Sequence, residues 1–146
     1  MSRSKASFSF TAEQGVPPQV GPFSHATRWG DLVFVTGQMP TDPATNQLVS
    51  GGLVAQANQV RRNLEAVLAQ FELSLDDVLM VRVYLRSFDD YDAFNETYQN
   101  WFNQSLPSRT CVGVTGLAVG AVVEIDLIAG IPQKNLINRD IDGYRQ

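Results

Sequence analysis

The sequence predicts an α+β fold in which two helices cover one face of a single β-sheet. Two segments have apolar residues spaced three and four apart, as in amphipathic helices, and they alternate with stretches rich in Val, Ile, Thr and aromatic residues that favour strands. The order along the chain is strand, strand, helix, strand, helix, strand, strand. Because two helices can cover only one face, apolar strands also predict an oligomer that covers the other face.

The first two strands are predicted to form a hairpin. Residues 32–36, Leu-Val-Phe-Val-Thr, have a strand composition, and Trp29-Gly30-Asp31 supplies a turn after a shorter strand at residues 25–28. Residues 41–46 then form a turn-rich loop, in which Pro43 favours an extended conformation for the preceding residue. After Ser50-Gly51-Gly52, the apolar residues recur at the three- and four-residue spacing of a helix.

The first helix and the third strand follow. The apolar helix positions are Ala57, Val60, Leu64, Val67, Leu68 and Phe71. Residues 78–85 are apolar at nearly every position, which is typical of a mid-sheet strand covered on both faces. Ser87 or Asp89 can cap the second helix, which Pro107 cannot continue. Its apolar face consists of Tyr91, Phe94, Tyr98, Trp101 and Phe102.

The last two strands flank a short glycine-bounded turn and are predicted to form a second hairpin. We take the register in which Thr115 pairs with Gly120. It places Cys111 opposite Glu124 and puts Arg109 on the same strand face, two residues further out. Diagonal neighbours lie about 7–8 Å apart, so Arg109 and Glu124 could hold the two ends of one small substrate. A strand-edge ion pair explains the same spacing.

Composition and charge limit the possible functions. The net charge is −4, the pI is about 4.8, and no basic run exceeds Arg61-Arg62, so no nucleic-acid partner is expected. One cysteine and one histidine cannot supply the usual zinc ligands, and a single cysteine excludes an intrachain disulfide. No apolar run reaches the length of a membrane span. We expect no metal, no membrane partner, a reducing compartment and a cytoplasmic location.

The length fits one domain. A chain of 146 residues can bury a substantial core but is short for two domains. The domain is predicted at residues 19–131, after an N-terminal segment at residues 1–18. A polar C-terminal tail at residues 132–146 follows it.

Six short motifs occur in order over about residues 21–129. They are Gly21-Pro22-Phe23-Ser24-His25-Ala26, Val35-Thr36-Gly37-Gln38, Asp42-Pro43-Ala44-Thr45, Phe94-Asn95-Glu96-Thr97-Tyr98, Pro107-Ser108-Arg109-Thr110-Cys111 and Val123-Glu124-Ile125. With these motifs in this order, the chain resembles the RidA/YjgF family of reactive-intermediate imine and enamine deaminases, which is also labelled L-PSP endoribonuclease-like. The resemblance implies a chorismate-mutase-like fold with a single mixed β-sheet and two helices on one face. It also implies a homotrimer with a central barrel and active sites between subunits.

The resemblance assigns catalytic roles to two residues. Arg109 would bind the carboxylate of an imino acid, which its planar guanidinium can hold through two parallel hydrogen bonds. Glu124 would position the attacking water and exchange protons with it. A carboxylate in an apolar strand usually needs a partner or has a raised pKa, which is compatible with this role and also with a subunit contact. Asp126 shares its predicted face and is a rival for the same role.

Further residues are expected to line the pocket. Cys111 would contact or orient the substrate rather than attack it, Asn95 would direct its amide into the cleft, and Gly37 would permit close approach of a ligand. Each of these residues also has a purely structural interpretation. Cys111 could be a buried thiol, Asn95 an amide on the helix surface, and Gly37 part of a turn that ends a strand. Phe23 stands where the family often has a tyrosine, so one pocket hydroxyl is absent. His25 is expected to be a hydrogen-bonded support.

The function predicted from these residues is hydrolysis of small 2-imino or enamine acids, such as 2-iminopropanoate or 2-iminobutanoate. The products would be the 2-keto acid and ammonia, and Arg109 and Glu124 would act without a cofactor. The alternative is a non-catalytic regulatory trimer that binds small carboxylates. A ribonuclease or translation inhibitor, suggested by family labels, is disfavoured because the chain is acidic and lacks a basic, aromatic-lined strip. The physiological substrate and the role of the tail are left open.

Overall fold

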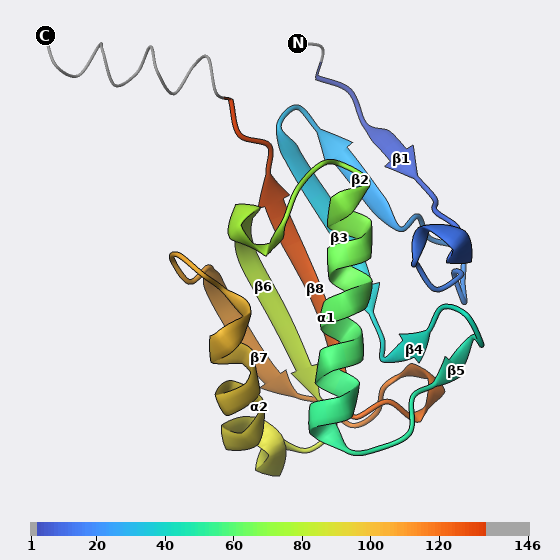
Figure 1. Cartoon of the computed structure of the whole chain (residues 1–146), viewed down its shortest axis with the longest axis vertical. Helices are drawn as coiled ribbons and strands as arrows, with labels where there is room; N and C mark the ends of the chain where they lie inside the picture. The colour runs from blue at the N-terminus through green and yellow to red at the C-terminus, as the bar shows by residue number, and fades with distance from the viewer. Residues whose placement is uncertain (1–2, 134–146) are drawn as a thin grey trace, which may run out of the picture.

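The computed structural model describes residues 3–133, so most of the predicted tail lies outside the described residues. The main sheet contains β1 (Ala6–Phe8), β2 (Ala26–Trp29), β3 (Leu32–Gln38), β6 (Val78–Leu85), β7 (Ser108–Gly113) and β8 (Val123–Gly130). Its strand order is β1-β2-β3-β8-β6-β7. The helices α1 (Leu53–Ala69) and α2 (Tyr91–Tyr98) lie on the same face of this sheet (Figure 1). The predicted α+β class is confirmed.

The sheet is mixed, because β6 and β7 run parallel while the other neighbours are antiparallel. The predicted first hairpin is confirmed, with Ala26 paired to Val35 and Trp29 paired to Leu32. The sheet is not the only one in the described residues. Where a loop was predicted, β4 (Thr41–Asp42) and β5 (Gln47–Leu48) form a small ribbon. The Asp42 Oδ1 accepts the Ala44 N–H at 2.8 Å, which tightens the turn between them.

The predicted hairpin between the last two strands is wrong. Both strands exist, but β6 lies between them, pairing with β7 on one edge and with β8 on the other. Residues 114–122 cross the end of β6, where Val114 N–H donates to Leu85 O and Arg86 N–H donates to Val122 O. β6 can form backbone hydrogen bonds along both of its edges, with β7 on one side and β8 on the other. The segment at residues 114–122 is long enough to connect β7 to β8 across the end of β6.

The helices bury alternate residues of the sheet. Val81, Val83 and Leu85 of β6 are buried beneath them, whereas Arg82 on the other face is exposed. Within one chain, β6 is therefore covered on one face rather than on both. The predicted helix positions from Ala57 to Leu68 are buried, and Phe71 follows the end of α1. Short 3₁₀ turns flank α2, and the Ser87 hydroxyl accepts the Asp89 N–H of the first turn.

The face of the sheet without helices carries large apolar side chains that are 39% to 51% exposed. They are Trp29, Leu32, Phe34, Leu79 and Val112. Exposed apolar side chains gathered on one face are typical of surfaces that bind another protein, a ligand or a membrane. Within residues 3–133, neither helix is long and apolar enough to cross a membrane.

His25 ties the N-terminal segment to the sheet. The side chain is 1% exposed, its Nδ1 accepts the Phe10 N–H at 2.8 Å, and its Nε2 lies 2.8 Å from Pro17 O. These contacts assign the neutral tautomer that carries its proton on Nε2. Burial lowers the pKa of His25, and the bond to the Pro17 carbonyl opposes this. The predicted supporting role agrees with this environment.

We predict that the protein loses stability as the pH falls through 6.5, the ordinary pKa of histidine. The unfolded chain binds a proton at His25 more readily than the folded chain, so protonation favours unfolding and the loss levels off below the folded-state pKa. Urea unfolding at pH 7.5 and 5.5 measures the effect. His25→Gln, which keeps a donor and an acceptor but does not titrate, should show a smaller pH difference. Equal differences in the two proteins would contradict this account.

Candidate functional site

Arg109 lies on the helix-covered face of β7, inside a cradle of aromatic rings from α2. Its Cζ lies 5.7 Å from the Tyr91 ring centroid, 5.8 Å from that of Phe94 and 4.9 Å from that of Tyr98. Its Nη2 also donates to the Tyr91 hydroxyl at 3.3 Å. These three aromatic residues share one face of α2 because they are spaced three and four apart. Within residues 3–133, no carboxylate forms an ion pair with Arg109, so its fork can bind an anion.

Cys111 shares the strand face of Arg109 and is half-buried. Burial raises the pKa of the Cys111 thiol, and the positive charge of Arg109 opposes this only in part. The thiolate is therefore disfavoured near neutral pH. This environment agrees with the predicted lining role and gives no support to covalent attack.

Two polar atoms on α2 are buried without a partner among the described residues. They are the Oδ1 of Asn95 and the hydroxyl of Tyr98. Burial raises the pKa of Tyr98 to about 12, so the hydroxyl keeps its proton. Buried polar atoms are normally hydrogen-bonded, so these two atoms are exceptions that lie close to the Arg109 side of the sheet. Sequence reasoning placed Tyr98 in the core only, although a phenol on an apolar helix face near an arginine was a usable signal.

Glu124 lies on the opposite, open face of the sheet and packs over Gly37. A Cβ atom at Gly37 would overlap the Glu124 Oε2 and lie 3.0 Å from Cδ. The pairing of β3 with β8 is irregular between Val35 and Gln38, which brings the Gly37 backbone close to Glu124. Burial raises the pKa of Glu124, and the negative charge of Asp126 raises it further. Gly37 was predicted to allow a ligand to approach the backbone closely. In the structure, the Glu124 carboxyl occupies the space that a side chain at Gly37 would need.

Asp126, the predicted rival of Glu124, is occupied by other contacts. Its Oδ1 accepts the Arg82 Nε–H at 2.7 Å, and its Oδ2 accepts the Tyr84 hydroxyl at 3.0 Å. In contrast, no hydrogen bond or ion pair within the described part of the chain holds the Glu124 carboxyl. Glu124 is therefore the better candidate for handling a water molecule.

Arg109 and Glu124 of one chain point to opposite faces of the sheet. Val81 of β6 pairs with Arg109 on one side and with buried Leu127 on the other, so Arg109 shares their helix-covered face. Tyr84 of β6 pairs with Glu124, which places Glu124 on the open face. The predicted convergence of the two residues within one hairpin is therefore wrong. A site that uses both needs two copies of the chain.

The open face is hollowed beside Glu124. A depression of about 400 Å³ is lined by Phe23, Thr36, Gly37, Arg82 and Asp126, among others. Phe23 is 40% exposed and lines this depression. Its ring has no hydroxyl, in contrast to the tyrosine that the family often has at this place. The depression is large enough for a small organic acid.

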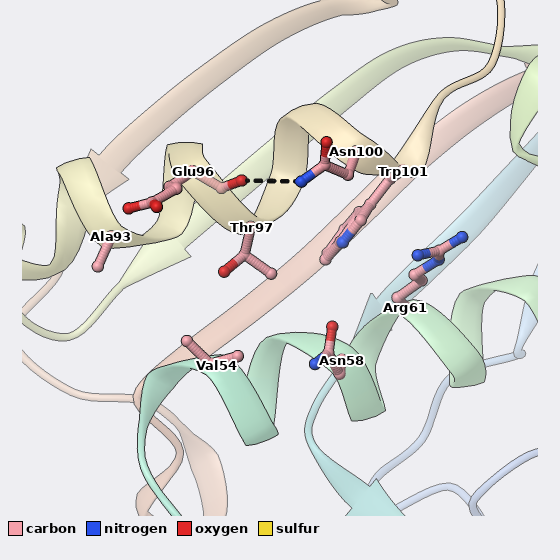
Figure 2. Close-up of a pocket in the computed structure, with 8 residues that line it drawn as sticks. All are labelled: Val54, Asn58, Arg61, Ala93, Glu96, Thr97, Asn100 and Trp101. Carbon is pink, nitrogen blue, oxygen red and sulfur yellow. Dashed lines mark hydrogen bonds between the residues drawn. The ribbon is translucent and has the colours of Figure 1, made fainter.

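A second hollow lies on the far side of the molecule, between α1 and α2. Figure 2 shows this groove of about 460 Å³, which contains none of the predicted site residues. Its one arginine, Arg61, is already paired with Glu65 at 3.2 Å and lies 6.0 Å from the Trp101 ring centroid. The groove therefore lacks an unpaired cation.

No metal site is preformed among residues 3–133. No group of three or more His, Cys, Asp or Glu side chains is arranged to hold an ion. His25 has both ring nitrogens in contact with backbone atoms, and Asp126 has both oxygens bonded.

Comparison with known proteins decides the family. Residues 14–131 match the family model described as Endoribonuclease L-PSP. The chain belongs to the RidA/YjgF (L-PSP) family. A RutC family protein of Pyrococcus horikoshii is 38% identical over 116 residues, which are 80% of this chain and 92% of the relative. The 2-iminobutanoate/2-iminopropanoate deaminase of Dermatophagoides farinae is 34% identical over 115 residues, which are 79% of this chain and 90% of that one.

Solved structures of this family have the same fold. RidA from an Antarctic Psychrobacter has a TM-score of 0.77 and 36% identity, and the match covers 81% of this chain and 95% of that one. Escherichia coli TdcF with bound serine has a TM-score of 0.80 and 27% identity, with coverage of 87% and 100%. The RidA-type arrangement of sheet and helices, implied by the sequence motifs, is thus confirmed.

Proposed function

We propose that this protein hydrolyses small 2-imino and enamine acids, such as 2-iminopropanoate and 2-iminobutanoate, to 2-keto acids and ammonia. The observation that carries the proposal is a pair of oppositely charged groups, Arg109 and Glu124, neither of which has an ion-pair partner among residues 3–133. Arg109 is a cation held by aromatic rings, and Glu124 is a half-buried carboxyl group with a raised pKa. The name of the Dermatophagoides farinae relative supports the same reaction.

The site is proposed to form between subunits of a homotrimer. Arg109 and Glu124 of one chain lie on opposite faces of its sheet, so Arg109 of one copy would face Glu124 of the next. The exposed apolar side chains of the open face supply a surface for such an assembly. Cys111 and Asn95 would line the arginine side of the pocket, and Phe23 and Gly37 would line the glutamate side.

The chemistry follows from these two charges. Arg109 binds the substrate carboxylate and thereby fixes the neighbouring imine carbon. The oxygen of water bonds to that carbon as Glu124 takes one of the water protons, and the C=N π electrons move to the nitrogen of the protonated imine, which gives a neutral carbinolamine. Glu124 passes its proton to the amino group of the carbinolamine. The C–N bond then breaks as Glu124 takes the hydroxyl proton to leave the 2-keto acid, and Glu124 hands that proton to ammonia, which departs as ammonium. A carboxyl group with a raised pKa exchanges protons more readily near neutral pH than an exposed glutamate.

A regulatory protein that binds small carboxylates without turnover is the second candidate. It is favoured by the same Arg109, which has no ion-pair partner among residues 3–133, and by the structure of Escherichia coli TdcF with bound serine. Binding of 2-ketobutyrate through Arg109 without imine hydrolysis would establish it. Ribonuclease activity, which the family description names, is disfavoured because the net charge is −4 and no basic run in the sequence exceeds Arg61-Arg62.

We predict that the protein accelerates keto-acid formation from 2-iminopropanoate generated in situ. Arg109→Ala should lower kcat/KM by about a hundredfold, because a charge-assisted bidentate contact is lost, and Glu124→Gln should lower mainly kcat. Keto acid is measured against the spontaneous rate in buffer. A wild-type rate equal to buffer, or an Arg109→Ala variant as fast as wild type, would refute the proposal.

A shared site predicts that two inactive variants complement each other. Co-assembled Arg109→Ala and Glu124→Gln chains should regain about a quarter of wild-type activity, because each site draws Arg109 from one copy and Glu124 from its neighbour. The two variants are unfolded together, refolded and assayed, and each variant refolded alone is the control. Mixed oligomers as inactive as the separate variants would argue for a site within one chain.

Gly37→Ala is expected to lower the deaminase rate at least about tenfold, since the added Cβ displaces the Glu124 carboxyl. Gly113→Ala is the matched control, because a Cβ there meets the nearest side-chain atoms of Phe88 at an ordinary 3.6 Å. Both variants are assayed for imine hydrolysis and for thermal unfolding. If both retain the wild-type rate, the close packing of Glu124 over Gly37 is not required for activity.

A further inference from the structure

Three polar side chains beside Glu124 are not used by the proposed mechanism. Arg82 of β6 lies directly opposite Asp126 of β8, and Tyr84 lies directly opposite Glu124, all on the open face. Asp126 accepts one hydrogen bond from Arg82 at 2.7 Å and another from the Tyr84 hydroxyl at 3.0 Å. The three residues form a hydrogen-bonded cluster, of which Arg82 and Asp126 line the hollow described above.

This arrangement fixes the Asp126 carboxylate. Each of its oxygens is bonded to a different residue of β6, and its side chain is only 15% exposed. Asp126 follows Glu124 by two positions on one strand, so the two side chains share a face and their Cα atoms lie about 7 Å apart. At that distance, in a partly buried setting, charges interact appreciably. The Arg82 side chain is 57% exposed, so solvent weakens its opposing charge.

We propose that Asp126 is a positioning residue for Glu124: held by Arg82 and Tyr84, it supplies a fixed negative charge that favours the protonated form of the Glu124 carboxyl. This inference rests on the proposed role of Glu124 in proton transfer. It assigns opposite effects to two members of one ion pair. Asp126 disfavours ionised Glu124, whereas Arg82 favours it by partly neutralising Asp126.

The other groups around Glu124 do not duplicate this effect. From β6, the only titratable side chains facing it are Tyr84 and Arg82. From β3, Thr36 and Gly37 carry no charge, and exposed Lys5 before β1 lines the same hollow. In the proposed trimer, Arg109 of the neighbouring copy would also face Glu124 and would favour its ionised form. The direction of the Glu124 pKa, raised by burial and then by Asp126, agrees with this arrangement.

The test follows Glu124 directly in the full-length protein. The side-chain carboxyl carbon of Glu124 is titrated by ¹³C NMR in wild type, Asp126→Asn and Arg82→Gln, with Glu124→Gln identifying the signal. The midpoint should move to lower pH in Asp126→Asn and to higher pH in Arg82→Gln. Asp126→Glu, which keeps the charge, should restore most of the wild-type midpoint. A purely structural ion pair would move both broken-pair variants in the same direction or in neither.

Imine hydrolysis supplies a second readout. On the acid side of the kcat/KM profile, Asp126→Asn should retain about two- to fivefold more of its maximal activity than wild type, and Arg82→Gln should retain less. Equal profiles in an active protein, or midpoints that move together, overturn the inference. An inactive wild type overturns the proposed function instead, while the NMR titration still decides whether Asp126 acts on Glu124.

Discussion

Side-chain alternation along three adjacent strands governs how this protein can build a site. Because β7, β6 and β8 pair in register, each residue of β6 defines which residues of its two neighbours share its face. Arg109 pairs with buried Val81, so it lies on the helix-covered face. Glu124 pairs with Tyr84, so it lies on the open face. One-residue slips would reverse these positions, but the buried apolar residues under α1 and α2 forbid such slips. The opposite orientation of the two residues is therefore a property of the core itself.

Each face of the sheet carries one of the two charged residues of the proposed site. The helix-covered face gives Arg109 a cradle of aromatic rings, which stabilises the cation without neutralising it. The open face gives Glu124 a site over a glycine, where burial and Asp126 raise its pKa. Glu124 has no hydrogen-bond or ion-pair partner among residues 3–133, and a partly buried carboxyl group without a partner reduces folding stability, which favours a functional role for it. In the proposed trimer, the apolar side chains of the open face would contact a neighbouring copy.

Much of this fold could be predicted from local sequence, but the strand pairing could not. The positions of both helices and of the strands at residues 32–36 and 78–85 follow from apolar periodicity and β-branched content. The pairing of β7 with β6 depends on contacts distant in sequence, and a glycine-bounded turn suggested a hairpin instead. For the site, Arg109 and Glu124 were predicted from the family resemblance, because their spacing alone fits an ordinary ion pair equally well. The contact of Gly37 with Glu124 and the bonds of Asp126 depend on side-chain positions that a linear pattern does not encode.

The central claim is that one active site uses Arg109 of one copy and Glu124 of another. A crystal structure of the assembled protein with pyruvate or benzoate tests it most directly. The account predicts that the ligand carboxylate lies on the Arg109 guanidinium at a subunit boundary, with Glu124 of the adjacent copy on its other side. A ligand bound away from Arg109, or an assembly in which no Glu124 approaches a neighbour's Arg109, would contradict it.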